Sequence, residues 1–285
     1  MIKLCAFADE YGKQVDAQIE GLTKNNIHLV ELRNVDGKNI ADITDEEAVA
    51  CYRKLSAAGI AVWSLGSPMG KVDINCDWEE YKQKKVRRLC HIANLVHTDK
   101  IRMFSFYNAY DSREKVLDYL AEMTAIAAEY GVTLYHENEK EIYGDTLERV
   151  LDLVDNAKGL KFVYDPANFI QCGQDSDKTI AALFDKTAYF HVKDVIAATQ
   201  QLVPAGYGDG RIDKIIARID PTKQTVMTIE PHLAVFDGYA QIDNSEMKNK
   251  FNYPDNHAAF DAAVGAIKKL LVDGGYTETA DGFVK

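Results

Sequence analysis

The sequence lacks any long hydrophobic run. Hydrophobic residues make up 47% of the 285 positions, but no stretch approaches the roughly 18 consecutive apolar residues that a membrane-spanning helix needs. The segment MIKLCAFADEYG also lacks the apolar core and the small-residue cleavage site of a secretory leader. We therefore expect a protein that has no membrane partner and works in the cytoplasm.

Basic charge is also in short supply. The chain carries 33 Lys and Arg against 44 Asp and Glu, which gives a formal net charge of -11. The densest basic run, KQKKVRR at 82–88, follows the acidic start of a helical pattern at 77–80, and we interpret it as a solvated helix face. Because excess negative charge repels a phosphate backbone, we expect no nucleic-acid partner.

The sequence has no paired cysteine framework and no linker. Its five cysteines are odd in number and scattered, which favours free thiols in a reducing compartment. No low-complexity tract, repeat or Pro/Gly-rich segment marks a domain boundary. We therefore expect residues 1–285 to form one domain.

Short β-rich runs recur along the chain with helical patterns between them, at intervals typical of βα units. Parallel strands need such crossovers, and closure of the sheet removes its edges, so the pattern predicts an α/β fold of the (β/α)8 TIM barrel type. A doubly wound open sheet is the alternative, although no Gly-rich phosphate turn follows the first run. The eight predicted strands are Ile2–Ala8, His28–Arg33, Ala61–Gly66, Lys100–Phe106, Val132–Glu137, Lys161–Asp165, Ala188–Lys193 and Thr225–Glu230.

The segments between the strands carry helix start and stop signals. Thr44 and Glu47 have the spacing of a capping box, and Gly59 can end that helix in a left-handed conformation. The longest irregular stretch, 233–254, follows the eighth predicted strand. Since βα loops surround the active site of a barrel, we expect this loop to cover it.

Polar residues close four consecutive predicted strands. Glu137, Asp165, His191 and Glu230 stand at the carboxyl ends of strands five to eight, where TIM barrels place their active sites. Strand alternation puts the apolar neighbours of His191 and of Glu230 on the opposite face. The pattern therefore predicts that both side chains point into the barrel mouth.

Three carboxylates and one imidazole so close together repel one another unless a cation is present. The four residues are thus a candidate site for one divalent metal ion. Oxygen-rich ligation with one nitrogen suits Mn2+ and is compatible with Mg2+, Co2+ or Zn2+. Taken singly, each residue also fits a helix cap or a paired surface group, and Asp165 before Pro166 is a natural turn starter.

At these positions the sequence resembles the xylose isomerase-like superfamily of TIM barrels, in its sugar phosphate isomerase/epimerase branch. The resemblance spans nearly the whole chain, and its most specific motifs lie at the strand ends in the family's order. The matching stretches are FADEYG (7–12), HLVELRNVDGKNI (28–40), SLGSPMGKV (64–72), IRMFSFY (101–107), HENEKEIYGDT (136–146), YDPANF (164–169), HVKD (191–194) and IEPH (229–232).

The resemblance implies that Glu137, Asp165, His191 and Glu230 are the metal ligands. It further implies that Glu137 and Glu230 carry protons to and from the carbon next to a carbonyl, through an enediolate. The substrate would be a small sugar or sugar phosphate, and the protein a possible homo-oligomer, as a dimer or tetramer. Asn168 departs from the ketose 3-epimerase pattern, in which a substrate-binding His fills this position.

Four further residues are candidate substrate ligands. Arg33 and Lys71 are candidates for a carboxylate or phosphate, Lys193 shares the inward face of His191, and Asn168 follows Asp165. An alternative role for each charged residue is pairing with carboxylates around the barrel mouth.

Three other functions remain open from the sequence. A dehydratase of an inosose-type ketone begins with the same proton abstraction. A nuclease like endonuclease IV needs more metal ligands and a basic face, whereas this chain has only seven His and a net charge of -11. A non-catalytic sugar-binding barrel would not need a complete ligand set.

Overall fold

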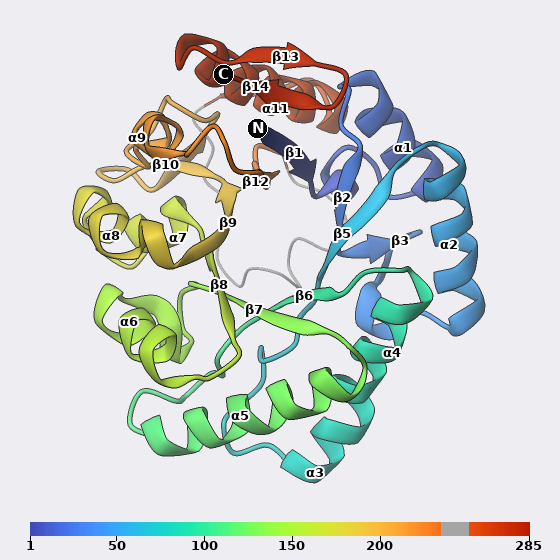
Figure 1. The fold of residues 1–285 in the computed structure, drawn as a ribbon, viewed down its shortest axis with the longest axis vertical. Helices are drawn as coiled ribbons and strands as arrows, with labels where there is room; N and C mark the ends of the chain where they lie inside the picture. Colours follow the sequence, from blue (N-terminus) through green and yellow to red (C-terminus); the bar gives the residue numbers. More distant parts are fainter. Residues whose placement is uncertain (235–250) are drawn as a thin grey trace.

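Eight parallel strands close into a barrel inside a ring of helices (Figure 1). The structure is a computed structural model that describes residues 1–234 and 251–285. Each strand pairs with its sequential neighbour, and β12 pairs with β1 to close the barrel. This confirms the predicted (β/α)8 fold. The barrel strands are β1 (Ile2–Ala6), β2 (Leu29–Leu32), β5 (Ala61–Gly66), β6 (Lys100–Met103), β7 (Thr133–Glu137), β8 (Lys161–Tyr164), β9 (Thr187–Val192) and β12 (Thr225–Ile229).

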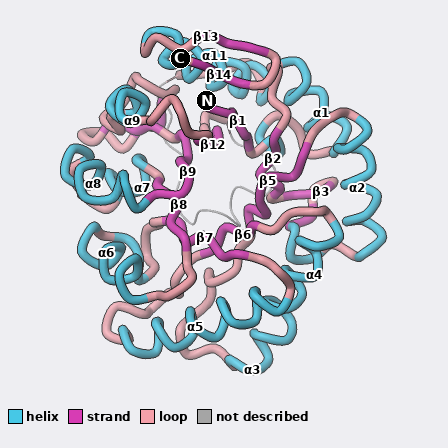
Figure 2. Tube along the Cα trace, viewed as in Figure 1, coloured by secondary structure: helices cyan, strands magenta, loops and turns pink. Residues whose placement is uncertain are grey.

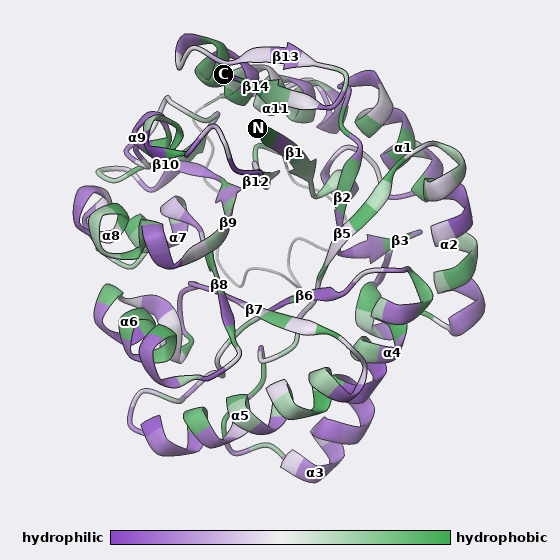
Figure 3. Cartoon of the chain, viewed as in Figure 1, coloured by the Kyte–Doolittle hydropathy of each residue, from purple (hydrophilic) through white to green (hydrophobic). Residues whose placement is uncertain are grey.

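The helices cover the outside of the barrel (Figure 2). They carry both hydrophobic and hydrophilic residues (Figure 3), as expected for helices that pack one face on a sheet and expose the other. The α-helices are α1 (Val15–Lys24), α2 (Asp45–Ala57), α3 (Trp78–Tyr81), α4 (Arg87–Leu95), α5 (Arg113–Glu129), α6 (Leu147–Asn156), α7 (Pro166–Gln171), α8 (Ser176–Leu183), α9 (Ile212–Arg218) and α11 (Asn256–Asp273). Shorter helical segments are η1 (Ala8–Glu10), η2 (Ile40–Asp42), the π-helical η3 (Lys82–Val86), η4 (Tyr143–Asp145) and η5 (Phe184–Lys186).

The predicted helix signals act as expected. Thr44 and Glu47 form a complete capping box at the start of α2, and Gly59 beyond its end has a φ of 73°. Asp165 caps α7, where Pro166 takes the first helical position because its missing N–H is not needed there. These local rules fix where the chain leaves the barrel mouth.

Two predicted strands end earlier than expected. The run that begins at Ile2 stops at Ala6, and Ala8–Glu10 turns into η1. The run from Lys100 stops at Met103. Beyond it, the amide of Phe104 donates to Met69 O in the preceding loop instead of to a barrel strand, and Phe106 has a positive φ of 71°.

Three hairpins were not predicted. They are β3–β4 (Asn34–Val35 with Lys38–Asn39), β10–β11 (Asp194–Ile196 with Gln201–Val203) and β13–β14 (Thr277–Thr279 with Gly282–Val284). The last of these pairs β14 antiparallel with β1. Asp194 organises the loop after β11, because its carboxylate accepts the amides of Gly206, Gly208 and Gly210.

The barrel interior changes from apolar to polar along its length. A small apolar cluster of Cys5, Val163, Tyr189 and Val226 fills part of the interior, and a larger core lies between strands and helices. Charged side chains gather where the strands end. No helix in the described ranges is long and apolar enough to cross a membrane. The predicted cover at 233–254 falls mostly on 235–250, outside the described residues.

Candidate metal centre

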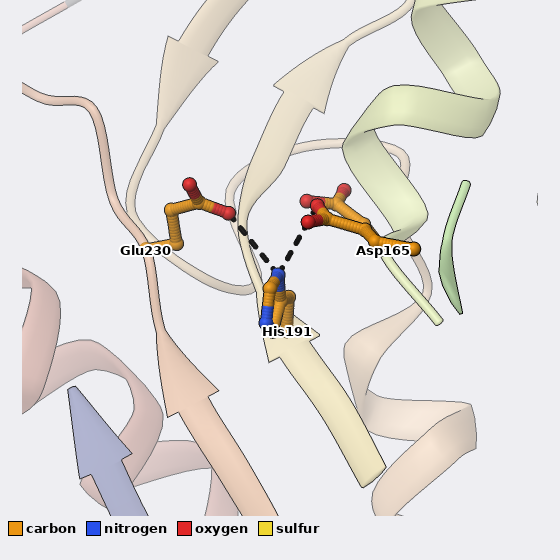
Figure 4. Close-up of side chains that lie close together, drawn as sticks. Asp165, His191 and Glu230 are labelled. Atoms are coloured by element: carbon orange, nitrogen blue, oxygen red, sulfur yellow. Dashed lines mark ion pairs between the residues drawn. The ribbon is translucent and has the colours of Figure 1, made fainter. Parts of the chain in front are cut away.

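Four buried side chains meet at the carboxyl ends of neighbouring strands. Glu137 ends β7, Asp165 follows β8, His191 lies in β9 and Glu230 follows β12. Each offers one ligand atom, and these four atoms lie within 4.8 Å of one another. Figure 4 shows the side chains of Asp165, His191 and Glu230 converging. The structure therefore brings together all four residues that the sequence singled out.

The ligand atoms face one another without satisfying one another. His191 Nδ1 lies 3.2 Å from Glu137 Oε1 and 3.2 Å from Glu230 Oε2. Among the described residues, His191 Nδ1, Asp165 Oδ2 and Glu230 Oε2 are buried and have no hydrogen bond of acceptable geometry. Buried polar atoms are nearly always satisfied, so this cluster of exceptions requires an explanation. A cation held between them supplies one.

The charge of the cluster supports the same conclusion. Burial raises the pKa of Asp165 to about 6, and the carboxylates of Glu137 and Glu230 add to the rise, against the effect of Lys193. Burial acts to lower the pKa of His191, but the nearby carboxylates of Glu137 and Glu31 outweigh it and raise that pKa well above its usual value. The side chains thus favour added positive charge, and a donor set of carboxylates and one imidazole fits a divalent ion.

Glu31 fixes the orientation of the imidazole. It is fully buried, its Oε2 lies 3.3 Å from His191 Nε2, and its Oε1 accepts a 2.9 Å hydrogen bond from Tyr189 Oη. When Nε2 donates to Glu31, Nδ1 keeps a lone pair that points toward the three other ligands. Carboxylates behind metal-binding histidines commonly have this role.

Arg33 reaches the site but is surrounded by carboxylates. Its Nη1 donates to Glu230 Oε1 at 3.0 Å, its Nε donates to Asp9 Oδ2 at 2.9 Å, and its Nη2 donates to Glu10 Oε1 at 3.2 Å. Asp9 and Glu10 were not predicted as site residues. The signal was present, because both acidic residues follow directly after the first predicted strand.

Asn168 and Lys193 also lie at the site. Asn168 Nδ2 donates to Glu137 Oε1 at 3.1 Å and to Asn138 O at 2.9 Å, so this amide holds a candidate ligand in position. Lys193 Nζ lies 3.0 Å from Asp165 Oδ2 and 3.7 Å from Glu230 Oε2. Burial acts to lower the pKa of Lys193, but the carboxylates of Asp165 and Glu230 outweigh it, so the amine is protonated.

Lys71 and Arg102 lie on the other side of the mouth. The Lys71 side chain is 8% exposed, and its Nζ is 3.1 Å from Glu139 Oε2. Arg102 is buried, with its Nε 3.1 Å from Glu137 Oε2. Arg102 was not predicted as a site residue. A charged residue between Ile101 and Met103 in a barrel strand was the available signal.

His136 lies on the face of β7 opposite to the one that carries Glu137. His136 is buried there, and its Nε2 lies 2.8 Å from Ser105 Oγ. Burial lowers the pKa of His136 to about 3, so this imidazole is neutral. It takes no part in the metal cluster.

Comparison with solved structures finds the same fold in proteins of low sequence identity. The probable 3-DHS dehydratase AsbF from Bacillus anthracis shares 16% identity at a TM-score of 0.69, over 95% of this chain and 98% of that one. A D-allulose 3-epimerase from Methylomonas sp. shares 12% at 0.71, over 94% and 98%. An IOLI protein solved with a zinc atom shares 16% at 0.69, over 95% and 97%.

A search of curated proteins finds no match. The family described as "Xylose isomerase-like TIM barrel" matches residues 23–249, which include every residue of the metal cluster. The match agrees with the closed parallel barrel and with the position of the cluster at its carboxyl end. The chain belongs to the xylose isomerase-like TIM barrel family.

Proposed function

We propose that this protein is a divalent-metal-dependent isomerase or epimerase of a small sugar or sugar phosphate. The observation that carries the proposal is the buried set of Glu137, Asp165, His191 and Glu230, in which the facing atoms of Asp165, His191 and Glu230 lack hydrogen bonds. Solved proteins of the same fold include a D-allulose 3-epimerase, an L-ribulose 3-epimerase and a protein crystallised with zinc. We expect Mn2+ as the ion, with Mg2+, Co2+ or Zn2+ as substitutes.

The ion would supply positive charge to the substrate oxygens as negative charge develops on them. The two glutamates would move the proton. Glu137 and Glu230 lie on either side of His191 Nδ1, at 3.2 Å each. One carboxylate takes the proton from the carbon next to the carbonyl. The other returns a proton either to the neighbouring carbon, which gives isomerisation, or to the opposite face of the same carbon, which gives epimerisation.

Neighbouring side chains hold the two proposed proton carriers, Glu137 and Glu230, in position. Arg33 donates to Glu230 Oε1, which leaves Oε2 on the side of the cluster. Asn168 donates to Glu137 Oε1, and Arg102 lies beside Oε2. These contacts fix the carboxylates in position before the substrate arrives, which lowers the cost of reaching the reactive geometry.

The test is a screen of ketoses, ketose phosphates and inososes with added Mn2+, read by NMR for solvent deuterium at a carbon-bound position. We expect exchange with at least one substrate, and a loss of about 10²–10⁴-fold in rate for Glu137→Gln and Glu230→Gln. Glu114→Gln is the matched control, since Glu114 is an exposed glutamate paired with Arg113. Absence of exchange with every substrate would contradict the proposal.

A dehydratase of an inosose-type ketone is the second candidate. Lys193 favours it, because a buried ammonium 3.0 Å from Asp165 could donate a proton to a departing hydroxyl. Asn168 stands where ketose 3-epimerases have a substrate-binding His, and this departure from the epimerase pattern is compatible with a dehydratase. Mass analysis of the product separates the two reactions, since only the dehydratase releases water.

A further inference from the structure

Two aromatic rings, Phe7 and Phe104, lie on the side of the barrel mouth formed by β1, β2, β5 and β6. A small cavity there is lined by Arg33, Lys71, Arg102 and Phe104 among others. The Arg33 Cζ lies 4.4 Å from the centroid of Phe7, and the Arg102 Cζ lies 4.6 Å from that of Phe104. The Lys71 Nζ is also 4.4 Å from the Phe104 centroid. Three cations thus surround one cavity, and the ring faces reduce their mutual repulsion.

Arg102 is held rigidly but retains donor capacity. Its Nη1 donates to Ser67 O at 2.9 Å, and Ser67 Oγ donates in return to Arg102 O at 2.7 Å. The side chain is buried, yet within the described residues its Nε has no hydrogen bond, although Glu137 Oε2 lies 3.1 Å away. A preformed guanidinium with an unsatisfied buried donor is suited to bind an anion.

Arg102 and Arg33 differ in how fully nearby carboxylates compensate their positive charge. Hydrogen bonds to Asp9, Glu10 and Glu230 compensate the guanidinium of Arg33. Arg102 Nε has two carboxylates nearby, Glu137 at 3.1 Å and Glu31 at 3.8 Å. Glu137 is also a proposed metal ligand, and Glu31 also contacts His191. Because a metal ion would share the charge of Glu137, Arg102 would then have less negative charge beside it.

We propose that Arg102 and Lys71 bind an anionic group of the substrate, a carboxylate or a phosphate, and so select charged over neutral sugars. The proposal rests on the proposed function, since the carbonyl of the same substrate must reach Glu137 and Glu230. Arg33 instead holds Glu230 in place. The cavity is small, so it has no room for a second sugar ring.

Anion binding can be tested without turnover. Mn2+-loaded protein is titrated calorimetrically with methyl phosphate and, separately, with glycolate. We expect one of the two probes to bind the wild type, and to bind Lys71→Gln and Arg102→Lys about tenfold or more weakly. Lys54→Gln is the matched control, because Lys54 is also paired with a carboxylate, Asp16, but at the exposed surface. The probe that binds more tightly identifies the charged group as phosphate or carboxylate.

Melting curves and Mn2+ titrations of each variant separate anion binding from folding and metal binding. Failure of the wild type to bind either probe, or equal binding by Lys71→Gln and Lys54→Gln, would overturn the anion assignment. The proposed function would then still stand on the deuterium exchange. Conversely, anion binding without exchange on any substrate would refute the proposed reaction and leave the anion site in place.

Discussion

The two halves of the barrel mouth differ in how their charges are satisfied. On the side of β7, β8, β9 and β12, three of the four ligands have facing atoms without hydrogen bonds. On the side of β1, β2, β5 and β6, carboxylates and cations are largely paired, as in the bonds of Arg33 to Asp9 and Glu10. Both halves are equally buried, so exposure does not explain the difference.

The comparison separates residues that bind from residues that support. Unsatisfied buried atoms are costly, so a fold that retains a group of them points to a ligand that is bound there. The contacts between the paired half and the unpaired half include Glu31 with His191, Arg33 with Glu230 and Arg102 with Glu137. Through these contacts, one side of the mouth can orient the ligands on the other.

The largest effect is expected from Asp165→Asn. The new side chain can still cap α7 through Oδ1, which accepts the amide of Asn168, but it lacks the charge. We expect Mn2+ affinity to fall by about 100-fold or more, with little change in melting temperature. Calorimetric titration with Mn2+ measures the first and circular dichroism the second. Unchanged affinity would remove Asp165 from the metal site.

Glu31→Gln should weaken the contact of Glu31 with His191, which joins the two halves of the mouth. With a neutral amide in place of the carboxylate, His191 Nε2 loses its charged acceptor, and we expect a loss of about 10–100-fold in Mn2+ affinity. Tyr189→Phe is the control, because it removes the other hydrogen bond of Glu31 and leaves the contact with His191. If both variants lose affinity equally, Glu31 acts through packing and not through the imidazole.

A metal ion bound by the four candidate ligands should raise the free energy of unfolding. At a free Mn2+ concentration 100 times the Kd, the free energy of unfolding should rise by about 2.7 kcal/mol. Urea denaturation with Mn2+ and with a chelator measures the difference. Asp165→Asn should show a much smaller gain at the same Mn2+ concentration, whereas an equal gain would place the ion elsewhere.

A further effect, dependent on pH, comes from His136 on the far face of β7. Burial lowers the pKa of His136 from 6.5 to about 3, so between these values the unfolded chain binds a proton that the folded chain does not. The free energy of unfolding should therefore be highest above pH 6.5 and fall with decreasing pH by up to about 1.4 kcal/mol per unit from this residue. His136→Gln should remove that share of the slope in urea titrations at pH 4 to 7. His28→Gln, at an exposed position, is the control.

Much of the fold could be predicted from the sequence because β-rich runs and helix caps are local signals. All eight barrel strands and the capping box at Thr44 were found in this way. The three hairpins were missed because strands of two or three residues have no periodicity to detect. The early end of β6 was missed because the amide of Phe104 donates to Met69 in a loop, a contact that the local sequence does not reveal.

The meeting of the four candidate ligands was predictable because they share one position, the end of a strand. Asp9 and Arg102 were not found, since their roles depend on contacts with Arg33 and Glu137, which belong to the neighbouring strands or the loops that follow them. Asn168 shows the same limit. Its position was predicted as substrate binding, a role that stays a prediction, and the structure places its amide on Glu137.

Closure of the barrel also determines when the cluster can form during folding. β1 pairs with β12 in register from Ile2 with Thr225 to Ala6 with Ile229, so the first strand keeps an open edge until the eighth has been synthesised. Glu230 follows that last strand. A nascent chain that lacks this segment therefore lacks one of the four candidate ligands. If a metal ion binds as we propose, it would complete its ligand set only after β12 has joined β1.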